Sequence, residues 1–168
     1  MRPQNLTPTS DSKSTEIQKK PIYLLSESKT NAQKAFYGLV NENNTSHAIY
    51  LDLRNQSLGD KDSKELSLLI ATRFSEIKVL DLSDNYFSTR SLKNFLKKLQ
   101  KIDIKEIRME KTNIDIKAIN YLISFMKYNK SLKKFLFGNV DRTKISTSYM
   151  EKISTLKKKG LSIHFTNV

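Results

Sequence analysis

Residues 77–87 read IKVLDLSDNYF, and this stretch decides the fold. Leu80 and Leu82 stand two positions apart, so on a β-strand both side chains point to the same face. Asn85 follows three residues later, where we expect the chain to turn. The stretch therefore predicts a short strand that buries Leu80 and Leu82, followed by a turn that contains Asn85.

The same apolar pattern recurs on both sides of this stretch. Segments equivalent to the one at Ile77 begin at Ala48, Ile104 and Leu132, and successive starts are 29, 27 and 28 residues apart. A shorter version begins at Leu161. A period of this length indicates one strand–turn–helix unit stacked several times, because a single unit cannot bury its apolar face alone.

Between the predicted strands, apolar residues recur every three or four positions, which predicts helices with one apolar stripe each. The stripes contain Leu66, Leu69, Ile70 and Phe74; Leu92, Phe95, Leu96 and Leu99; Ile119, Leu122, Ile123 and Met126; and Met150, Ile153 and Leu156. The predicted N-caps are Ser63, Ser88, Asp115 and Ser146, and Gly160 stands where a glycine ends the last helix. We expect every stripe to pack against the strands.

The chain divides into three segments by composition. Residues 1–20 are polar, with two prolines and few apolar side chains, which predicts a flexible tail. Residues 21–47 contain a helical pattern and are interpreted as an N-terminal cap or a degenerate first repeat. Residues 48–168 hold about four repeats and a terminal strand, so we expect one domain of the α/β class.

These residues resemble the leucine-rich repeat family, in its long-repeat, ribonuclease-inhibitor-like form. Residues 77–87 match the pattern L-xx-L-x-L-xx-N-x-L at every defined position when Ile and Phe are accepted for Leu, and 48–58 match it in part. Thr112 and Val140 replace the asparagine in later repeats. The resemblance implies an α/β solenoid with a parallel sheet on the concave side and helices on the convex side. It also implies that the asparagine bonds to backbone groups of neighbouring coils.

The family implies protein–protein recognition through the concave sheet, with a partner that the sequence does not identify. A small, lysine-rich set of repeats behind a polar start is also similar to leucine-rich effectors that intracellular bacteria deliver into host cells. The start of the chain, MRPQNLTPTS, lacks the apolar core of a Sec signal peptide. We therefore expect a cytoplasmic location, or delivery into a host cell by a non-Sec route.

Residues that alternate with the inward positions point away from the core and form the exposed rows of the sheet. The predicted partner-binding residues are Tyr50, Val79, Glu106 and Lys134 in the first row, Asp52, Asp81, Arg108 and Leu136 in the second, and Arg54, Ser83 and Glu110 in the third. Asp81 is expected to be exposed and replaceable at little cost in stability. Pairing of Asp81 with Arg108 across neighbouring strands is the alternative to a role in binding.

The predicted sheet is small for a protein interface. Five short strands cover roughly 320 Å² in plan, whereas each partner in a standard interface buries roughly 800 Å². We therefore expect the partner also to contact the turns after the strands, near Asn55, Asp84, Lys111 and Asn139.

The last predicted strand begins at Leu161, which is aligned with Phe135 of the strand before it. This alignment places Ser162 in the second exposed row and His164 in the third. We expect the outer edge of this strand to leave backbone N–H and C=O groups unpaired. The sequence therefore predicts self-association through this edge, or addition of a partner's strand.

Several features argue against an enzyme. The chain has no cysteine, which excludes disulfides, thiolate zinc sites and a cysteine nucleophile. It contains no phosphate-loop, dinucleotide-binding or zinc-protease motif. Asp52 and Asp81 would lie about 4.8 Å apart, near the separation of a glycosidase pair, but an open sheet provides no water-excluding cleft. We therefore expect no catalytic residues, no metal site and no cofactor.

The charge suggests an alternative function. Lys and Arg number 30 against 17 Asp and Glu, and residues 77–168 carry +12 of the net +13. Of the 30 basic residues 24 are lysines, a bias that an A+T-rich genome produces without selection for anion binding.

The lysine clusters are Lys93, Lys97, Lys98 and Lys101; Lys127, Lys130, Lys133 and Lys134; and Lys157, Lys158 and Lys159. The alternative is a basic adaptor that binds anionic lipid or nucleic acid through these faces. The scarcity of arginine and of exposed aromatic residues among the lysines disfavours nucleic acid.

Overall fold

The structure is a computed structural model, and it describes residues 30–40, 47–138, 140–141, 143 and 145–165. Strands and helices alternate throughout this part of the chain. In order they are α1 (Asn31–Val40), β1 (His47–Asp52), α2 (Asp60–Arg73), β2 (Glu76–Asp81), α3 (Thr89–Lys98), β3 (Asp103–Met109), α4 (Ala118–Phe125), β4 (Lys134–Phe137), α5 (Thr147–Lys158) and β5 (Ser162–Phe165).

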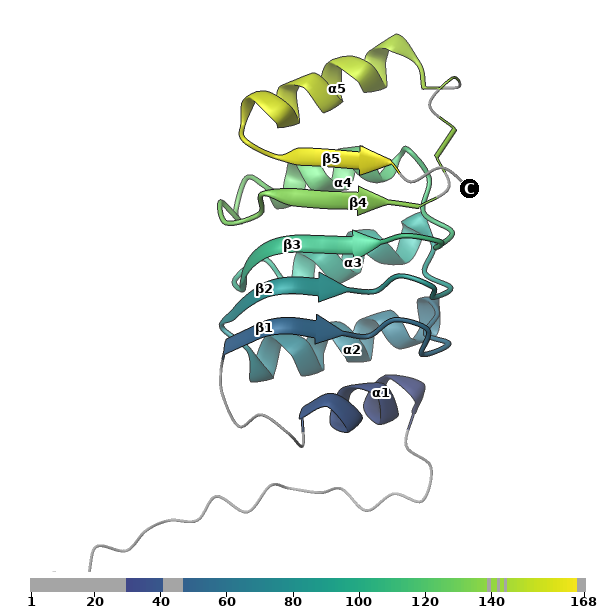
Figure 1. The fold of residues 1–168 in the computed structure, drawn as a ribbon, viewed down its shortest axis with the longest axis vertical. Helices are drawn as coiled ribbons and strands as arrows, with labels where there is room; N and C mark the ends of the chain where they lie inside the picture. Colours follow the sequence, from purple (N-terminus) through teal and green to yellow (C-terminus); the bar gives the residue numbers. More distant parts are fainter. Residues whose placement is uncertain (1–29, 41–46, 139, 142, 144, 166–168) are drawn as a thin grey trace, which may run out of the picture.

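The strands form one parallel sheet in the order β1-β2-β3-β4-β5, so each strand pairs with its neighbours in the sequence. Figure 1 shows the sheet in front, the helices α2, α3 and α4 behind it, and α5 beyond β5 at the end of the stack, so the helices cover one face. The predicted α/β class, with a parallel sheet alternating with helices, is confirmed. The predicted self-association through the outer edge of β5 stays a prediction.

The core lies between the sheet and the helices. Leu80 and Leu82 are fully buried, as the sequence predicts, and Leu80 lies beside Leu51 and Ile107 of the neighbouring strands. The apolar stripes of α3 and α4 are buried against them. Met150 is an exception, because 52% of its surface is exposed. It lies on α5, which stands at the end of the stack and has α4 as its principal neighbour among the described helices (Figure 1).

A single side chain, Asn85, joins two successive turns. Its Oδ1 accepts hydrogen bonds from the backbone N–H groups of Gln56 (3.1 Å) and Leu58 (3.0 Å). Its Nδ2 donates to the carbonyl oxygens of Leu53 (2.8 Å) and Leu82 (3.0 Å). Because these groups lie in a tight turn without a strand partner, the buried amide supplies the bonds that the backbone cannot make itself.

The next turn lacks this bridge. Thr112 occupies the equivalent position, and its hydroxyl donates to the carbonyl of Met109 (2.7 Å) within the same coil. The following turn instead approaches through Gly138, whose N–H donates to the carbonyl of Met109 (3.1 Å). A Cβ atom at Gly138 would collide with the backbone of Glu110 and Lys111, so only glycine permits this approach.

The helix ends follow the sequence in part. Gly160 ends α5 with a φ of 87°, as predicted, and the N–H of Leu161 bonds to the carbonyl of Leu156 in a Schellman arrangement. Ser63 is not the N-cap of α2, which begins at Asp60. The reason is that the Asp62 carboxylate accepts the N–H of Gly59 (2.9 Å), which makes Gly59 the N-cap, four residues earlier than predicted.

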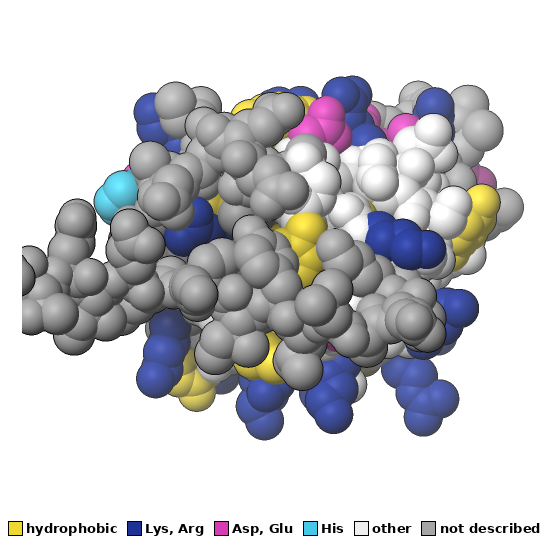
Figure 2. All heavy atoms as spheres, turned by 90° about the horizontal axis from the view of Figure 1, so that it is seen from below, with side chains coloured by type: hydrophobic (Ala, Val, Ile, Leu, Met, Phe, Trp, Pro, Cys, Tyr) yellow, Lys and Arg dark blue, Asp and Glu magenta, His cyan; other side chains and the backbone are white. Residues whose placement is uncertain are grey.

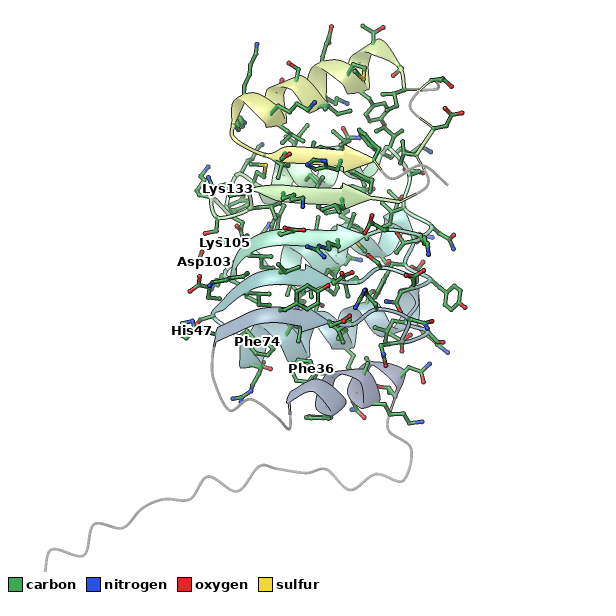
Figure 3. All side chains as sticks on the ribbon, in the orientation of Figure 1. Phe36, His47, Phe74, Asp103, Lys105 and Lys133 are labelled. Carbon is green, nitrogen blue, oxygen red and sulfur yellow. The ribbon has the colours of Figure 1, made fainter. Side chains whose placement is uncertain are left out.

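Helix α1 packs on α2 beside β1, at the first edge of the sheet. The rings of Phe36 and Phe74 meet edge to face, with centroids 6.1 Å apart (Figure 3). Thr30 donates to the Glu65 carboxylate (2.7 Å), and the Gln33 amide donates to the same carboxylate (2.7 Å). The interpretation of residues 21–47 as an N-terminal cap or a degenerate first repeat stays a prediction. Residues 21–29 and 41–46 lie outside the described part, as does the predicted tail 1–20.

Replacement of Asn85 by Ala should destabilise the protein by about 3 kcal/mol, because it leaves buried donors and acceptors of two turns unpaired. Replacement of Thr112 by Val should cost only about 1 kcal/mol, because one bond within a single coil is lost. Urea unfolding followed by circular dichroism measures both. Equal losses would show that Asn85 does not tie the two turns together.

Candidate functional site

The face of the sheet opposite the helices carries the residues that the sequence assigns to partner binding. The strand register confirms that they lie together in rows. Tyr50, Val79, Glu106 and Lys134 stand side by side, as do Asp52, Asp81, Arg108 and Leu136. Arg54, Ser83 and Glu110 follow in the turns after β1, β2 and β3.

The predicted alignment of the last strand is wrong by two residues. Phe135 pairs with Ile163 rather than Leu161, so Ser162 lies beside Lys134 and His164 beside Leu136. Leu161 is buried directly before β5, in the turn that follows Gly160. An apolar residue just outside a strand has the same sequence signal as one within it, and this shifted the alignment.

Asp81 is almost completely buried, although its strand position points away from the core. The exposed fraction of its side chain is 3%. The hydroxyl of Tyr50 donates to its Oδ2 (2.7 Å), and the N–H of Ser83 donates to its Oδ1 (3.1 Å). The guanidinium groups of Arg54 and Arg108 lie 3.8 and 3.7 Å from Oδ2. The expectation of an exposed Asp81 is therefore wrong, because side chains from the neighbouring coils cover it.

Further charge pairs extend from Asp81 across the sheet. Arg54 binds Asp52 through Nε (2.9 Å) and Nη2 (2.6 Å). Arg108 donates to Glu106 (2.6 Å), and the Lys134 ammonium lies 3.3 Å from the same carboxylate. Together with Tyr50 and Asp81, these residues form a continuous charge ladder over β1 to β4. The guanidinium of Arg108 thus forms an ion pair with Asp81 across the strands, a contact that the sequence suggested.

The charge ladder perturbs the titration of its members. Hydrogen bonds from Arg54 lower the pKa of Asp52. Burial, assisted by the hydrogen bond to Asp81 and its negative charge, raises the pKa of Tyr50 above 10.0. The hydrogen bond to Glu106 raises the pKa of Arg108. Each shift favours the protonation state that keeps the ladder intact near neutral pH.

Asp52 and Asp81, which invite comparison with a glycosidase pair, are both bonded to arginine or tyrosine partners. Among the described residues, no group of three His, Asp or Glu side chains is placed to hold a metal ion. None of the described helices is both long and apolar enough to cross a membrane.

Sequence reasoning missed the shielding of Asp81 by Tyr50. The two residues lie on neighbouring strands in a diagonal relation, because Tyr50 pairs with Val79 and Asp52 pairs with Asp81. A tyrosine placed diagonally to an aspartate on the same face is long enough to reach it. The predicted register alone could have suggested this contact.

Replacement of Asp81 by Ala should destabilise the protein by about 1–3 kcal/mol, because it removes the acceptor of the Tyr50 hydroxyl and the Ser83 N–H. Replacement of Asp52 by Ala, in the more exposed pair with Arg54, should cost about 0–1 kcal/mol. Thermal unfolding of the two variants compares the effects. A larger loss for Asp52 would contradict the burial of Asp81.

Tyr50 should titrate above the ordinary tyrosine value of 10.0. Its raised pKa means that the contribution of Tyr50 to stability is present below pH 10 and is lost as the pH rises through the folded-state pKa. Carbon-13 NMR of ζ-labelled tyrosine follows each ring separately. Replacement of Asp81 by Asn should bring the pKa of Tyr50 down, and an unchanged value would exclude the aspartate as a cause.

Comparisons with known proteins give a likeness of fold. No family model and no curated protein matches the chain. A solved structure described as the leiomodin-1 actin-binding site 2 superposes with a TM-score of 0.63. The match covers 83% of this chain and 82% of that chain, at 12% sequence identity. At this identity the likeness shows a shared α/β fold.

Proposed function

We propose that the chain is a leucine-rich repeat protein of the ribonuclease-inhibitor-like class and that it serves as a protein–protein interaction scaffold. The recurrence of one strand–turn–helix unit supports the first part. Asn55, Asp84 and Lys111 stand at the same place in successive turns, and each has a φ of 50° to 55°. Asn85 bonds the turns of neighbouring units, as the asparagine of this family is expected to do.

The open face of the sheet is the observation that supports a binding role. The helices lie on the other face, so this one is free to meet a partner (Figure 1). Tyr50 is 42% exposed, Val79 is half-buried beside it on β2, and Leu136 is half-buried on β4. Tyrosine and arginine held in fixed positions are typical of the residues that dominate binding energy, because little side-chain freedom is lost on association.

The turns after the strands extend this surface. Asn55, Asp84 and Lys111 are exposed and lie at the ends of β1, β2 and β3. Because five short strands alone provide roughly 320 Å², contact with these turns is needed to approach a standard interface of roughly 800 Å² per partner. Asn139, the fourth predicted contact, lies outside the described residues.

Actin is the first partner to test, because the structure with a similar fold is described as an actin-binding site. A bacterial effector that acts inside a host cell would meet actin there, which agrees with the expected cytoplasmic or host-delivered location. The proposal assigns the chain no catalytic step, no metal and no cofactor. Actin is one example of a partner for the proposed scaffold, and binding of a different protein to the same face would also agree with the proposal.

The experiment compares three charge-introducing variants. Leu136→Glu alters the open face, Lys111→Glu alters a turn, and Lys157→Glu alters α5 as a matched control on the helix side. Co-sedimentation with actin filaments, and affinity capture from a host-cell lysate with mass spectrometry, measure binding. The first two variants should bind the partner protein at least tenfold more weakly than the unchanged chain does. The control should bind it as tightly as the unchanged chain. Loss in the control alone would move the interface away from the sheet.

A further inference from the structure

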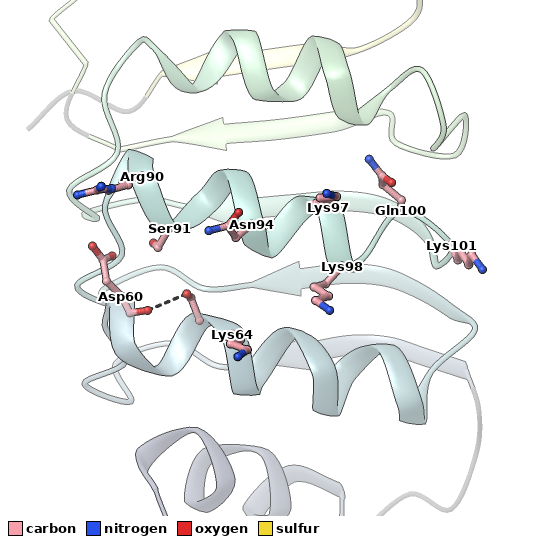
Figure 4. A pocket seen from close by; sticks show the side chains of 10 residues that line it. Asp60, Lys64, Arg90, Ser91, Asn94, Lys97, Lys98, Gln100 and Lys101 are labelled. Carbon is pink, nitrogen blue, oxygen red and sulfur yellow. Dashed lines mark hydrogen bonds between the residues drawn. The ribbon is translucent and has the colours of Figure 1, made fainter.

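The helix side of the molecule has a groove between α2 and α3 (Figure 4). The groove has a volume of about 870 Å³. Five basic side chains line it: Lys64 from α2, Arg90, Lys97 and Lys98 from α3, and Lys101 just after α3. Figure 4 shows them spread along its length, with Arg90 at one end and Lys101 at the other.

The lysines of this groove are not neutralised by ion pairs with described residues. None of its four lysines forms an ion pair with a described residue, in contrast to the paired charges on the sheet. Residues 85–102 contain five Lys and Arg and no Asp or Glu. Asp60, the acidic residue of the groove, already accepts hydrogen bonds from the N–H (2.8 Å) and hydroxyl (2.6 Å) of Ser88. Unpaired cations collected in a hollow attract anions.

Figure 2 shows the same contrast along the two edges of the molecule when it is seen from below. Seen along the stack, dark blue Lys and Arg side chains project from the lower edge, which is the helix side. Magenta Asp and Glu side chains lie among the blue ones at the upper edge, which is the sheet side. The two faces therefore differ in kind, because one is charge-balanced and the other is cationic.

A second, smaller groove lies on the opposite flank of α3, between α3 and α4. It shares Lys97 with the first groove and adds Lys93. Tyr121 and Tyr128 also line it, and 69% of the surface of Tyr128 is exposed. Helix α3 is thus a basic ridge with a cationic groove on one flank and an exposed aromatic ring on the other.

We propose that this helix side binds single-stranded nucleic acid, with phosphates along the α2–α3 groove and a base stacked on Tyr128. Backbone-tracking cations together with an exposed ring are the two features that single-strand binding needs. A planar bilayer contacts ridges rather than the floor of a groove, and an acidic peptide does not need the ring. A duplex keeps its bases stacked inside, so it gains nothing from Tyr128.

This proposal differs from the expectation drawn from sequence. That expectation disfavoured nucleic acid because the lysines lack arginine and exposed aromatic neighbours. The structure places Arg90 among the lysines of one groove and Tyr128 beside Lys93 and Lys97 in the other. The proposal does not depend on the protein partner of the sheet, since the two surfaces lie on opposite faces.

Fluorescence anisotropy with a labelled 12-nucleotide oligouridine and the full chain tests the electrostatic part. If all five cations contact phosphates, the slope of log K against log salt should be about −3.5, at about −0.7 for each phosphate of a single strand. Lys97→Gln with Lys98→Gln should reduce the slope by about 1.4. The matched control, Lys157→Gln with Lys158→Gln, removes the same charge from α5 and should leave the slope unchanged.

The stacking part has its own pair of variants. Tyr128→Ser should weaken binding of the oligouridine about tenfold, a factor typical of one lost base–ring stack. Tyr86→Ser is the control, because Tyr86 is 65% exposed but lies in the turn after β2. Circular dichroism of every variant verifies that the fold is retained. Equal weakening by both tyrosine variants would overturn the stacking role.

Competing anions decide the class of ligand. The same chain is measured against a double-stranded RNA of equal length, poly-glutamate and vesicles of phosphatidylserine with phosphatidylcholine. The proposal expects the single strand to bind most tightly, with Tyr128→Ser affecting it alone. Tighter binding to poly-glutamate or to vesicles would overturn the proposal in favour of an acidic protein or a membrane. An equal decrease of the salt slope in the two double lysine variants would overturn the assignment of the phosphates to the α2–α3 groove.

Discussion

The amide of Asn85 holds the first repeating units in register. It lies in the turn that follows β2, where the ladder of backbone hydrogen bonds between neighbouring units continues only in part. By accepting from Gln56 and Leu58 and donating to Leu53 and Leu82, it continues the ladder with a side chain. Asn85 thereby supports the strand register, and this register sets the positions of the residues that form the charge ladder on the sheet. A shift of one residue would send Leu80 outward and Asp81 into the core.

The two faces of the molecule use charge in opposite ways. On the sheet, the outward residues of β1 to β4 bond to one another, so their charges are satisfied before any partner arrives. Such a face offers shape and fixed hydrogen-bond geometry more than long-range attraction. On the helix side, lysines stand without ion pairs around α3, and their field extends into the solvent. The sheet face therefore suits a specific contact with a protein, and the helix side suits a salt-sensitive contact with an anion.

The sequence was informative where structure follows from local spacing. Leu80 and Leu82 are buried as predicted, because alternation along one strand fixes their direction without knowledge of the rest. The burial of Asp81 needed Tyr50 and Arg108, which lie 31 and 27 positions away in the sequence. Met150 is exposed because no further described helix covers that side of α5. The apolar stripe of α5 alone does not predict whether such a helix is present. Tyr128 lies outside every apolar stripe, so no periodicity pointed to it.

The uneven bonding of successive turns has a consequence for how the molecule opens. Each strand mainly contacts the preceding and following strands, and each helix mainly contacts the preceding and following helices. The stability of each repeating unit therefore depends on the units next to it. Between β1 and β2 the turns are tied by Asn85, whereas Thr112 bonds within its own coil. The turns after β2 and β3 therefore lack an amide bridge between them, and we expect the units from β3 to β5 to open locally before the first two. We therefore expect the backbone amide protons of β4 and β5 to exchange with solvent faster than those of β1 and β2.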